Sequence, residues 1–291
     1  MKRALTIAAL VALVAACSPL KTFNSIVPKD AGSNKVAANI AYGSQDRQKL
    51  DVYLPETDGK GPQSASRAVV VFFYGGSWNS GTKDGYDFVG RALAAQGFVT
   101  VVPDYRLVPQ VRYPAFVEDG AAAVRWARQN AASYGGNADC VVLAGHSAGA
   151  YIAAMLAMDE RWLAEDREGV RGWVGLAGPY DFLPLDGPVT QDAFGNWPEP
   201  RETQPVTWAG KGDPAALLLT GEDDDTVLPR NSTRVASLLQ AEGVRASAKL
   251  YPDLGHVGII TAMARPLRGK APVLGDITAF VNESCGAAPQ D

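Results

Sequence analysis

The segment Cys140-Val-Val-Leu-Ala144, followed at once by Gly145-His-Ser-Ala-Gly149, decides the fold of this chain. The first five residues are continuously apolar, as strands buried on both faces of a parallel sheet are. The next five are small residues around Ser147 and His146, and they open a helical pattern from Ala148 to Met158. A sharp strand-to-helix turn of this type holds a serine hydroxyl above the end of the sheet. The alternative is a glycine-rich turn without chemistry.

Apolar runs and helical patterns alternate on both sides of this turn. The runs predict buried strands at 68–74, 99–103, 172–177, 215–220 and 246–250, and helical spacing occurs at 85–96, 114–134, 148–158, 229–243 and 272–283. Such alternation predicts an α/β fold with a mainly parallel twisted sheet of about eight strands and helices on both faces. No second domain is indicated.

Two segments depart from this alternation. Leu50 to Leu54 alternates in polarity before Pro55, which predicts an antiparallel edge strand. Residues 183–211 are rich in proline and glycine without a regular period, which predicts a short loop-rich cap over one end of the sheet.

The composition is that of a folded globular protein, because 47% of the 291 residues are hydrophobic and 20% are charged. These values exclude disordered, collagen-like and coiled-coil chains. The formal net charge of −4 argues against a nucleic-acid partner. Two histidines and three cysteines are too few for the usual zinc and iron–sulfur ligand sets, so we expect no metal site.

The N-terminus predicts export. Lys2 and Arg3 precede the uncharged run Ala4 to Ala16, which is too short to span a bilayer and is typical of a signal peptide, so residues 1–16 are predicted to be removed. Val14-Ala-Ala-Cys-Ser18 resembles the lipobox of bacterial lipoproteins, in which Cys17 would become the lipidated mature N-terminus. The alternative is ordinary cleavage near Ala16, which would leave a periplasmic or secreted protein.

The same resemblance predicts where the mature chain resides. A serine rather than an acidic residue at position 18 favours the periplasmic side of the outer membrane. Residues 17–35 are polar and lack periodicity, which predicts a lipidated N-terminus and tether before a folded domain over 36–291. No second long apolar run occurs, so the lipid anchor is the only membrane contact that we expect.

A serine nucleophile needs an adjacent base, and the chain has two candidates. His146 is next to Ser147 in sequence, so its side chain is expected to point away from the hydroxyl and to pack beside the turn. His256 follows the last predicted strand and would reach the same rim of the sheet as Ser147. The acidic run Glu222 to Asp225 follows the strand 215–220, so the order serine, acid, histidine is the one expected for this architecture. The run leaves open which carboxylate is used.

Several short motifs carry a family resemblance between about Leu50 and Val281. The chain resembles α/β-hydrolase esterases related to hormone-sensitive lipase and to bacterial feruloyl- and acetyl-esterase-like proteins. The matching motifs are Tyr74-Gly-Gly-Ser-Trp78 with Ser80-Gly81, Asp104-Tyr-Arg-Leu107, Tyr113-Pro-Ala-Phe-Val-Glu-Asp119, the serine turn, Gly178-Pro-Tyr-Asp181 and Gly221-x-x-Asp224-x-x-Val227. The resemblance implies a catalytic triad of Ser147, Asp224 and His256, with Asp225 as the alternative acid.

The resemblance also implies an oxyanion hole, although its loop departs from the family pattern. The usual sequence is His-Gly-Gly-Gly-Trp, whereas Tyr74 and Ser77 replace the histidine and the last glycine here. The donors are backbone N–H groups, so Gly76, Ser77 and Ala148 still serve. The sequence does not indicate which residues support this loop, because the phenol of Tyr74 cannot form both hydrogen bonds that the imidazole of the usual histidine forms.

Other matched positions are assigned by the same resemblance. Trp78 is expected at the mouth of the substrate pocket, with core packing as the alternative. Tyr180 and Asp181 follow a strand end and are expected to line the acyl or alcohol side. Asp104, Arg106 and Asp119 are expected to hold the loops that flank the site.

The leading hypothesis is a serine carboxylesterase that hydrolyses small or short-acyl esters through an acyl-enzyme and needs no cofactor. One alternative is an amide or peptide hydrolase with the same triad, although the chain has no gating domain of the kind that peptidases carry. A second alternative is a non-catalytic binding protein of the same fold. Loss of a triad residue would favour this alternative, but all three residues are present in the sequence. The sequence indicates no oligomeric state.

The two remaining cysteines are predicted to lie at one rim. Cys140 opens the strand that ends at Ser147, and Cys285 closes the last helical pattern, which runs back from the rim that carries His256. Export to an oxidising compartment favours a disulfide between them. The alternative is a buried apolar Cys140 and a frayed C-terminus around Cys285.

Overall fold

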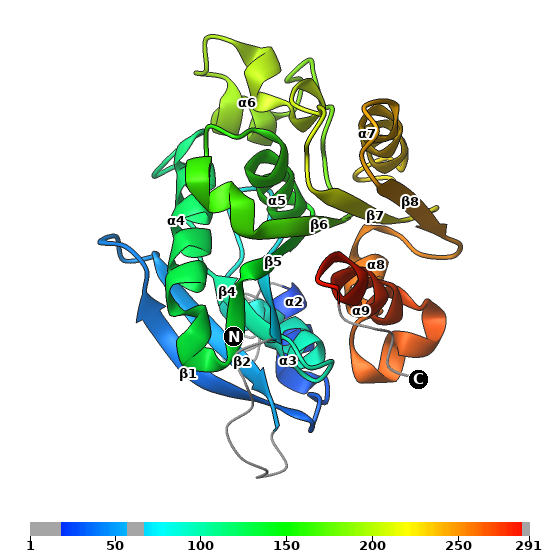
Figure 1. Ribbon diagram of the computed structural model, residues 1–291. Coiled ribbons are helices and arrows are strands. Elements are labelled where there is room, and N and C mark those ends of the chain that lie inside the picture. Colours follow the sequence, from blue (N-terminus) through cyan, green and yellow to red (C-terminus); the bar gives the residue numbers. More distant parts are fainter. Residues whose placement is uncertain (1–18, 57–66, 287–291) are drawn as a thin grey trace, which may run out of the picture.

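The computed structural model describes residues 19–56 and 67–286, and it contains one eight-stranded sheet flanked by helices (Figure 1). The predicted signal peptide and Cys17 lie outside the described residues. The strand order across the sheet is β1-β2-β4-β3-β5-β6-β7-β8. In chain order the strands are β1 (Ser33–Ala41), β2 (Lys49–Pro55), β3 (Arg67–Phe73), β4 (Val99–Pro103), β5 (Gly136–His146), β6 (Val170–Leu176), β7 (Ala215–Gly221) and β8 (Ala246–Tyr251).

All pairings from β4 to β8 are parallel, which confirms the predicted α/β sheet. Helices cover both of its faces, with α4 and α5 in contact on one face and α3 and α9 in contact on the other (Figure 1). The helices are α2 (Pro19–Ile26), α3 (Asp87–Ala94), α4 (Ala115–Asn130), α5 (Ala148–Met158), α6 (Pro188–Phe194), α7 (Arg230–Ala241), α8 (His256–Thr261) and α9 (Val273–Ser284).

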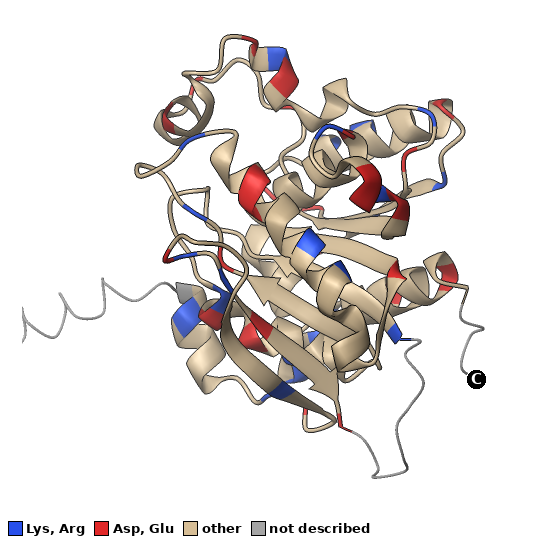
Figure 2. Cartoon of the chain, turned by 60° about the vertical axis from the view of Figure 1, so that its left-hand side comes forward, with Lys and Arg blue, Asp and Glu red and all other residues tan. Residues whose placement is uncertain are grey.

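Short 3-10 helices complete the connections. They are η1 (Lys83–Tyr86), η2 (Ala131–Tyr134), η3 (Ala164–Gly169), η4 (Pro200–Thr203), η5 (Pro205–Thr207) and η6 (Arg265–Lys270). The predicted cap over 183–211 is more regular than expected, because it contains α6, η4 and η5. Acidic and basic residues lie mainly on the outer helices and loops, while the central strands carry almost none (Figure 2).

The core explains why β5 and α5 can carry a site. Val141, Val142 and Leu143 are fully buried in the middle of the sheet. Every residue of α5 is buried as well, so this helix is apolar all round rather than along one stripe. Burying one such aliphatic side chain stabilises the fold by about 1.5–3 kcal/mol. The strand and the helix on either side of Ser147 are therefore among the most firmly held parts of the molecule.

The edge of the sheet differs from the sequence prediction. Residues 50–54 lie in β2, which is antiparallel to β4 as expected. However, β2 is not the edge strand, because β1 pairs with its outer side. Residues of β1 are mostly exposed or half-buried, and two register shifts interrupt its pairing. A strand with so little buried surface has no apolar run by which sequence alone could reveal it.

The predicted tether over residues 17–35 also differs from the structure. Residues 19–26 form α2, and β1 already begins at Ser33. The ring of Phe23 in α2 packs edge-on against Phe88 of α3, with the ring centroids 5.3 Å apart. Leu20, Phe23 and Val27 lie at helical spacing and pack on the core, but the helix is only eight residues long, so this pattern is too short to stand out in a polar stretch.

The structure joins Cys140 and Cys285 in a disulfide, with their Cα atoms 5.6 Å apart. The bond ties the residue after α9 to the first half of β5. It lies toward the end of the sheet opposite Ser147, which follows the last residue of β5. None of the helices in the described ranges is both long and apolar enough to cross a bilayer.

Candidate active site

Ser147 occupies a strained turn between β5 and α5. Its φ of 53° and ψ of −122° lie in a region that costs a non-glycine residue about 1–3 kcal/mol. Neighbouring backbone holds the turn in place, since the Ser147 N–H donates to the Leu176 carbonyl at 2.8 Å. A Cβ on Gly145 would lie 2.3 Å from Gly149, and a Cβ on Gly149 would lie 2.1 Å from the carbonyl oxygen of Phe73. Gly145 is therefore required by the close approach of α5 to the end of β5, and Gly149 by the close approach of α5 to β3.

The structure brings Ser147, His256 and Asp224 together. Nε2 of His256 lies 2.9 Å from Oγ of Ser147, and Nδ1 of His256 lies 2.9 Å from Oδ2 of Asp224. With Nδ1–H donating to the carboxylate, Nε2 is free to accept the serine proton. His256 is the first residue of α8, so it stands on a helix rather than in the loop that the sequence predicts.

The acidic run resolves to a single residue. Asp224 is buried, whereas Glu222, Asp223 and Asp225 are exposed. Burial opposes the ionisation of Asp224, but hydrogen bonds from His256 and from the backbone N–H groups of Val227 and Thr226 outweigh it and hold the pKa of Asp224 below its ordinary value. The carboxylate that faces His256 is therefore ionised at neutral pH, and Asp225 has no contact with the imidazole.

The loop after β3 runs against the serine turn. A Cβ on Gly75 would lie 3.0 Å from Cβ of Ser147, and Gly76 and Ser77 line the cleft that contains Ser147. Gly76 has a φ of 144°, and Ser77 a φ of 50°. Among the described residues, no acceptor bonds the backbone N–H of Gly76, Ser77 or Ala148. These three donors remain available to an oxygen of a bound ligand, as an oxyanion hole requires.

Arg47 supplies the support that Tyr74 alone could not give this loop. The guanidinium of Arg47 donates to the Tyr74 hydroxyl at 2.7 Å and to the Gly81 carbonyl at 3.0 Å. The Tyr105 hydroxyl donates to the Tyr74 carbonyl at 2.9 Å, and the two rings stack with centroids 4.6 Å apart. A tyrosine and an arginine thus take the place of the usual histidine. Sequence reasoning missed Arg47 because it lies in a polar turn outside every motif.

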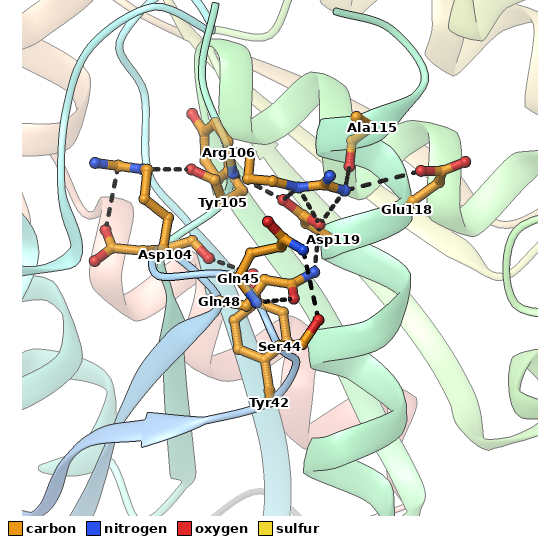
Figure 3. A network of polar contacts seen from close by, with 11 residues as sticks. Tyr42, Ser44, Gln45, Gln48, Asp104, Tyr105, Arg106, Ala115, Glu118 and Asp119 are labelled. Carbon is orange, nitrogen blue, oxygen red and sulfur yellow. Dashed lines mark hydrogen bonds and ion pairs between the residues drawn. The ribbon is translucent and has the colours of Figure 1, made fainter. Parts of the chain in front are cut away.

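Asp104, Arg106 and Asp119 hold the loops beside the site. Arg106 donates to Asp119 through its backbone N–H at 2.8 Å and through its guanidinium at 2.7 Å (Figure 3). The side chain of Gln48 donates to the same buried carboxylate at 2.7 Å. Asp104 accepts the Lys83 N–H at 2.7 Å. These contacts agree with the structural role predicted for all three matched residues.

His146 links the loop to the histidine of the triad, a role that sequence reasoning missed. Nε2 of His146 donates to the carbonyl oxygen of His256 at 3.0 Å. Nδ1 accepts from the Tyr86 hydroxyl at 3.2 Å, and that hydroxyl accepts the Gly75 N–H at 3.1 Å. Burial, together with the nearby His256, lowers the pKa of His146 to about 3, so it stays neutral and keeps this donor pattern. Tyr86 and His146 are 60 residues apart in the chain, so no sequence motif could reveal that their side chains are in contact.

Trp78 adopts the alternative that the sequence left open, core packing, and Tyr180 does not line the cleft at Ser147. Trp78 is 4% exposed and packs edge-on against Phe194 of the cap, with the ring centroids 4.8 Å apart. Tyr180 is fully buried against Trp173. Neither residue lines the cleft at Ser147. The cap closes over Trp78 and builds an aromatic cluster around it, so its large apolar surface is buried in the core and not at a pocket mouth.

The cleft at Ser147 has a volume of about 390 Å³. Its walls are the loop after β3, η1, the start of α8 and the first turn of α2. No group of three or more His, Cys, Asp or Glu side chains within 19–56 and 67–286 is arranged to hold a metal ion.

Comparison with known proteins identifies the family. The BD-FAE family model matches residues 50–239. The chain belongs to the BD-FAE family. The carboxylesterase NlhH of Mycobacterium tuberculosis is 34% identical over 70% of this chain and 70% of its own length. A probable isoprenylcysteine alpha-carbonyl methylesterase of Oryza sativa is 30% identical over 81% of this chain.

This BD-FAE member spans 60% of the rice relative's length. Solved structures agree on its fold. Esterase B from Lactobacillus rhamnosis superposes with a TM-score of 0.79 at 19% identity, over 98% of this chain and 97% of that one. Esterase 2 of Thermogutta terrifontis gives a TM-score of 0.74 at 23% identity, over 90% and 98%. At these identities the likeness shows the α/β-hydrolase fold alone.

We expect Asp224→Asn to reduce kcat by about four orders of magnitude, because the amide no longer fixes the imidazole tautomer or stabilises the imidazolium. Hydrolysis of p-nitrophenyl butyrate gives the rate. The matched controls Asp223→Asn and Asp225→Asn remove the neighbouring exposed charges, and we expect each to change kcat by less than about threefold. An inactive Asp225→Asn with an active Asp224→Asn would contradict the assignment.

Tyr86→Phe removes the hydroxyl that joins Gly75 to His146 and leaves two buried polar groups without a partner. We expect kcat to fall about tenfold, which corresponds to about 1.4 kcal/mol, and KM to change less. The reason is that the oxyanion loop stabilises a negative charge that forms only in the transition state. Tyr180→Phe is the control, since its buried hydroxyl has no partner among the described residues. Equal losses in the two variants would show that Tyr86 matters only for packing.

Proposed function

We propose that this chain is a serine carboxylesterase that hydrolyses short esters through an acyl-enzyme. One observation carries the proposal: the imidazole of His256 contacts Oγ of Ser147 and the carboxylate of Asp224 at the same time, at 2.9 Å each. A serine hydroxyl is a poor nucleophile on its own and is activated by a base held in this way. The backbone N–H groups of Gly76, Ser77 and Ala148, which have no acceptor among the described residues, supply the oxyanion hole that this reaction needs.

In the first half-reaction, Oγ of Ser147 attacks the ester carbonyl carbon while Nε2 of His256 takes the hydroxyl proton. Asp224 stabilises the resulting imidazolium. The backbone N–H groups of Gly76, Ser77 and Ala148 hold the oxyanion of the tetrahedral intermediate. The bond to the alcohol oxygen then breaks, and the leaving alcohol takes the proton from His256. The acyl group stays on Ser147.

In the second half-reaction, water attacks the acyl carbon and gives its proton to His256. The same N–H donors hold the second oxyanion, and collapse of this intermediate returns the proton to Oγ of Ser147 and releases the carboxylic acid. Every proton is accounted for by one histidine. The reaction needs no group beyond the residues named and a water molecule.

Two further observations support ester hydrolysis of small substrates. The relatives that cover most of this chain carry esterase names, among them the carboxylesterase NlhH and the esterase LipC of Mycobacterium tuberculosis. The cleft of about 390 Å³ is near the lower end of the range for small-molecule pockets, which is about 300–1,000 Å³. Short acyl and alcohol groups therefore fit this site best.

We expect Ser147→Ala to lower kcat by about four to six orders of magnitude while thermal unfolding stays nearly unchanged, because the lost atom is a nucleophile and makes little contribution to packing. Turnover of p-nitrophenyl acetate, butyrate and octanoate measures activity and acyl length together, with the butyranilide as the amide counterpart. Esterase activity retained in Ser147→Ala would refute the proposal, and faster cleavage of the anilide than of the ester would replace it with an amidase.

We also propose that the chain is exported and held at the periplasmic face of the outer membrane by lipid on Cys17. Support comes from the basic start of the sequence, the short apolar run that follows and the lipobox-like residues 14–18. A single acyl chain anchors a protein only marginally, whereas two or more acyl chains on one cysteine hold it stably.

Cys17→Ala should move the full-length protein from the membrane fraction to the soluble periplasm, because it removes the attachment point of the acyl chains. Fractionation followed by immunoblotting measures the shift. Ser18→Asp is the companion variant, which we expect to stay membrane-bound but to move from the outer to the inner membrane. Membrane-bound Cys17→Ala protein would show that another feature anchors the chain.

A further inference from the structure

The first turn of α2 contributes a positive charge to the cleft at Ser147. Lys21 lines this cleft together with Leu20. The other walls supply hydroxyl groups and backbone, and none of the lining residues is an aspartate or a glutamate. Apart from the two histidines, Lys21 is the only lining residue that can carry charge. The cleft thus has one cation and no anion among its lining side chains.

Specific contacts hold α2 at this wall. The side chain of Asn24 donates to the Asp84 carbonyl at 2.7 Å and accepts the Phe88 N–H at 2.9 Å. With the packing of Phe23 on Phe88, these bonds attach α2 to η1 and α3, which directly follow the oxyanion loop. The backbone N of Lys21 lies 3.8 Å from where a Cβ on Gly85 would stand. These contacts hold the backbone of Lys21 beside the cleft, while its side chain is exposed.

The charge of Lys21 is not used elsewhere in the described structure. Lys83 pairs with Asp51 at 3.0 Å, and Lys35 pairs with the same carboxylate at 2.9 Å. Lys29 donates to backbone carbonyls, including that of Val27 at 2.9 Å. Within residues 19–56 and 67–286, Lys21 has neither an ion pair nor a side-chain hydrogen bond. Lys21 is exposed, and an unpaired ammonium beside a cleft that lacks acidic lining residues raises the local concentration of anions.

We propose that Lys21 forms an anion subsite, so that the preferred substrates of this esterase are short esters that carry a free carboxylate, such as half-esters of dicarboxylic acids. The subsite rests on the proposed ester hydrolysis at Ser147. Lys21 does not touch the reacting atoms. It binds the carboxylate of the substrate portion that extends from Ser147 toward α2, and the ester bond is cleaved by the two half-reactions given above.

The test compares two substrates with acyl chains of equal length, mono-p-nitrophenyl succinate and p-nitrophenyl butyrate. Lys21→Gln should lower the ratio of their kcat/KM values about fivefold, as expected for one exposed charge pair, and Lys21→Glu should lower it about 25-fold. Added salt should reduce the ratio in the unmodified protein and leave it nearly constant in Lys21→Gln. A ratio that does not change in either variant would overturn the subsite.

Lys211→Gln is the matched control, because Lys211 is exposed and precedes β7 at the end of the sheet opposite Ser147. It changes the net charge equally, so an equal fall in the ratio would mean that overall charge and not a subsite is responsible. A loss of activity on both esters by the same factor in Lys21→Gln would show that Lys21 only supports α2.

A binding measurement separates this proposal from the proposed function. Calorimetry with monomethyl succinate on Ser147→Ala, with and without Lys21→Gln, reports the subsite without turnover. We expect the Lys21 change to weaken binding about fivefold, and methyl butyrate to show no such difference. If no ester is hydrolysed but this difference remains, the esterase proposal fails and the anion subsite stands. Equal binding in both proteins would overturn the subsite whatever the activity.

Discussion

The strained backbone of Ser147 is the constraint on which the rest of the site depends. A φ of 53° at a serine persists only where surrounding structure outweighs its cost. Here β5 is buried at the centre of the sheet and α5 is buried on every side. Gly145 lets the helix start close to β5, and Gly149 lets it approach β3. The hydrophobic core thus stabilises a turn that local propensity disfavours, and it fixes the direction of the nucleophile.

Around this turn, polar side chains fix the positions of the oxyanion loop and of His256 relative to Ser147. Arg47 and Tyr105 support the oxyanion loop through Tyr74, and His146 with Tyr86 joins that loop to the carbonyl of His256. These contacts come from segments far apart in the chain, and most of the groups involved are buried. In such surroundings each lost partner leaves an unsatisfied polar group, so the network positions the loop and the base as one unit.

The N-terminal segment shows how a mostly polar sequence with one short apolar pattern can fold. α2 and β1 bury little apolar surface, and they are held by side-chain hydrogen bonds of Asn24, by one aromatic contact and by strand pairing with β2. This segment, which composition alone assigns to a tether, forms a wall of the cleft. The cleft is therefore built in part by residues that precede every motif of the family, Leu20 and Lys21 of α2.

The sequence by itself determined the architecture and most of the chemical constellation. Buried strands appear as continuous apolar runs, the serine turn follows its strand directly, and His256 is the one histidine not adjacent to Ser147 in the sequence. The family resemblance added the oxyanion loop and the acid. The family motif selected Asp224 from the four adjacent acids, with Asp225 as the alternative. Only the tertiary structure decided that Trp78 lies under the cap and that Arg47, Tyr86 and Lys21 belong to the site. The reason is physical: burial and long-range hydrogen bonds join residues whose spacing along the chain carries no information.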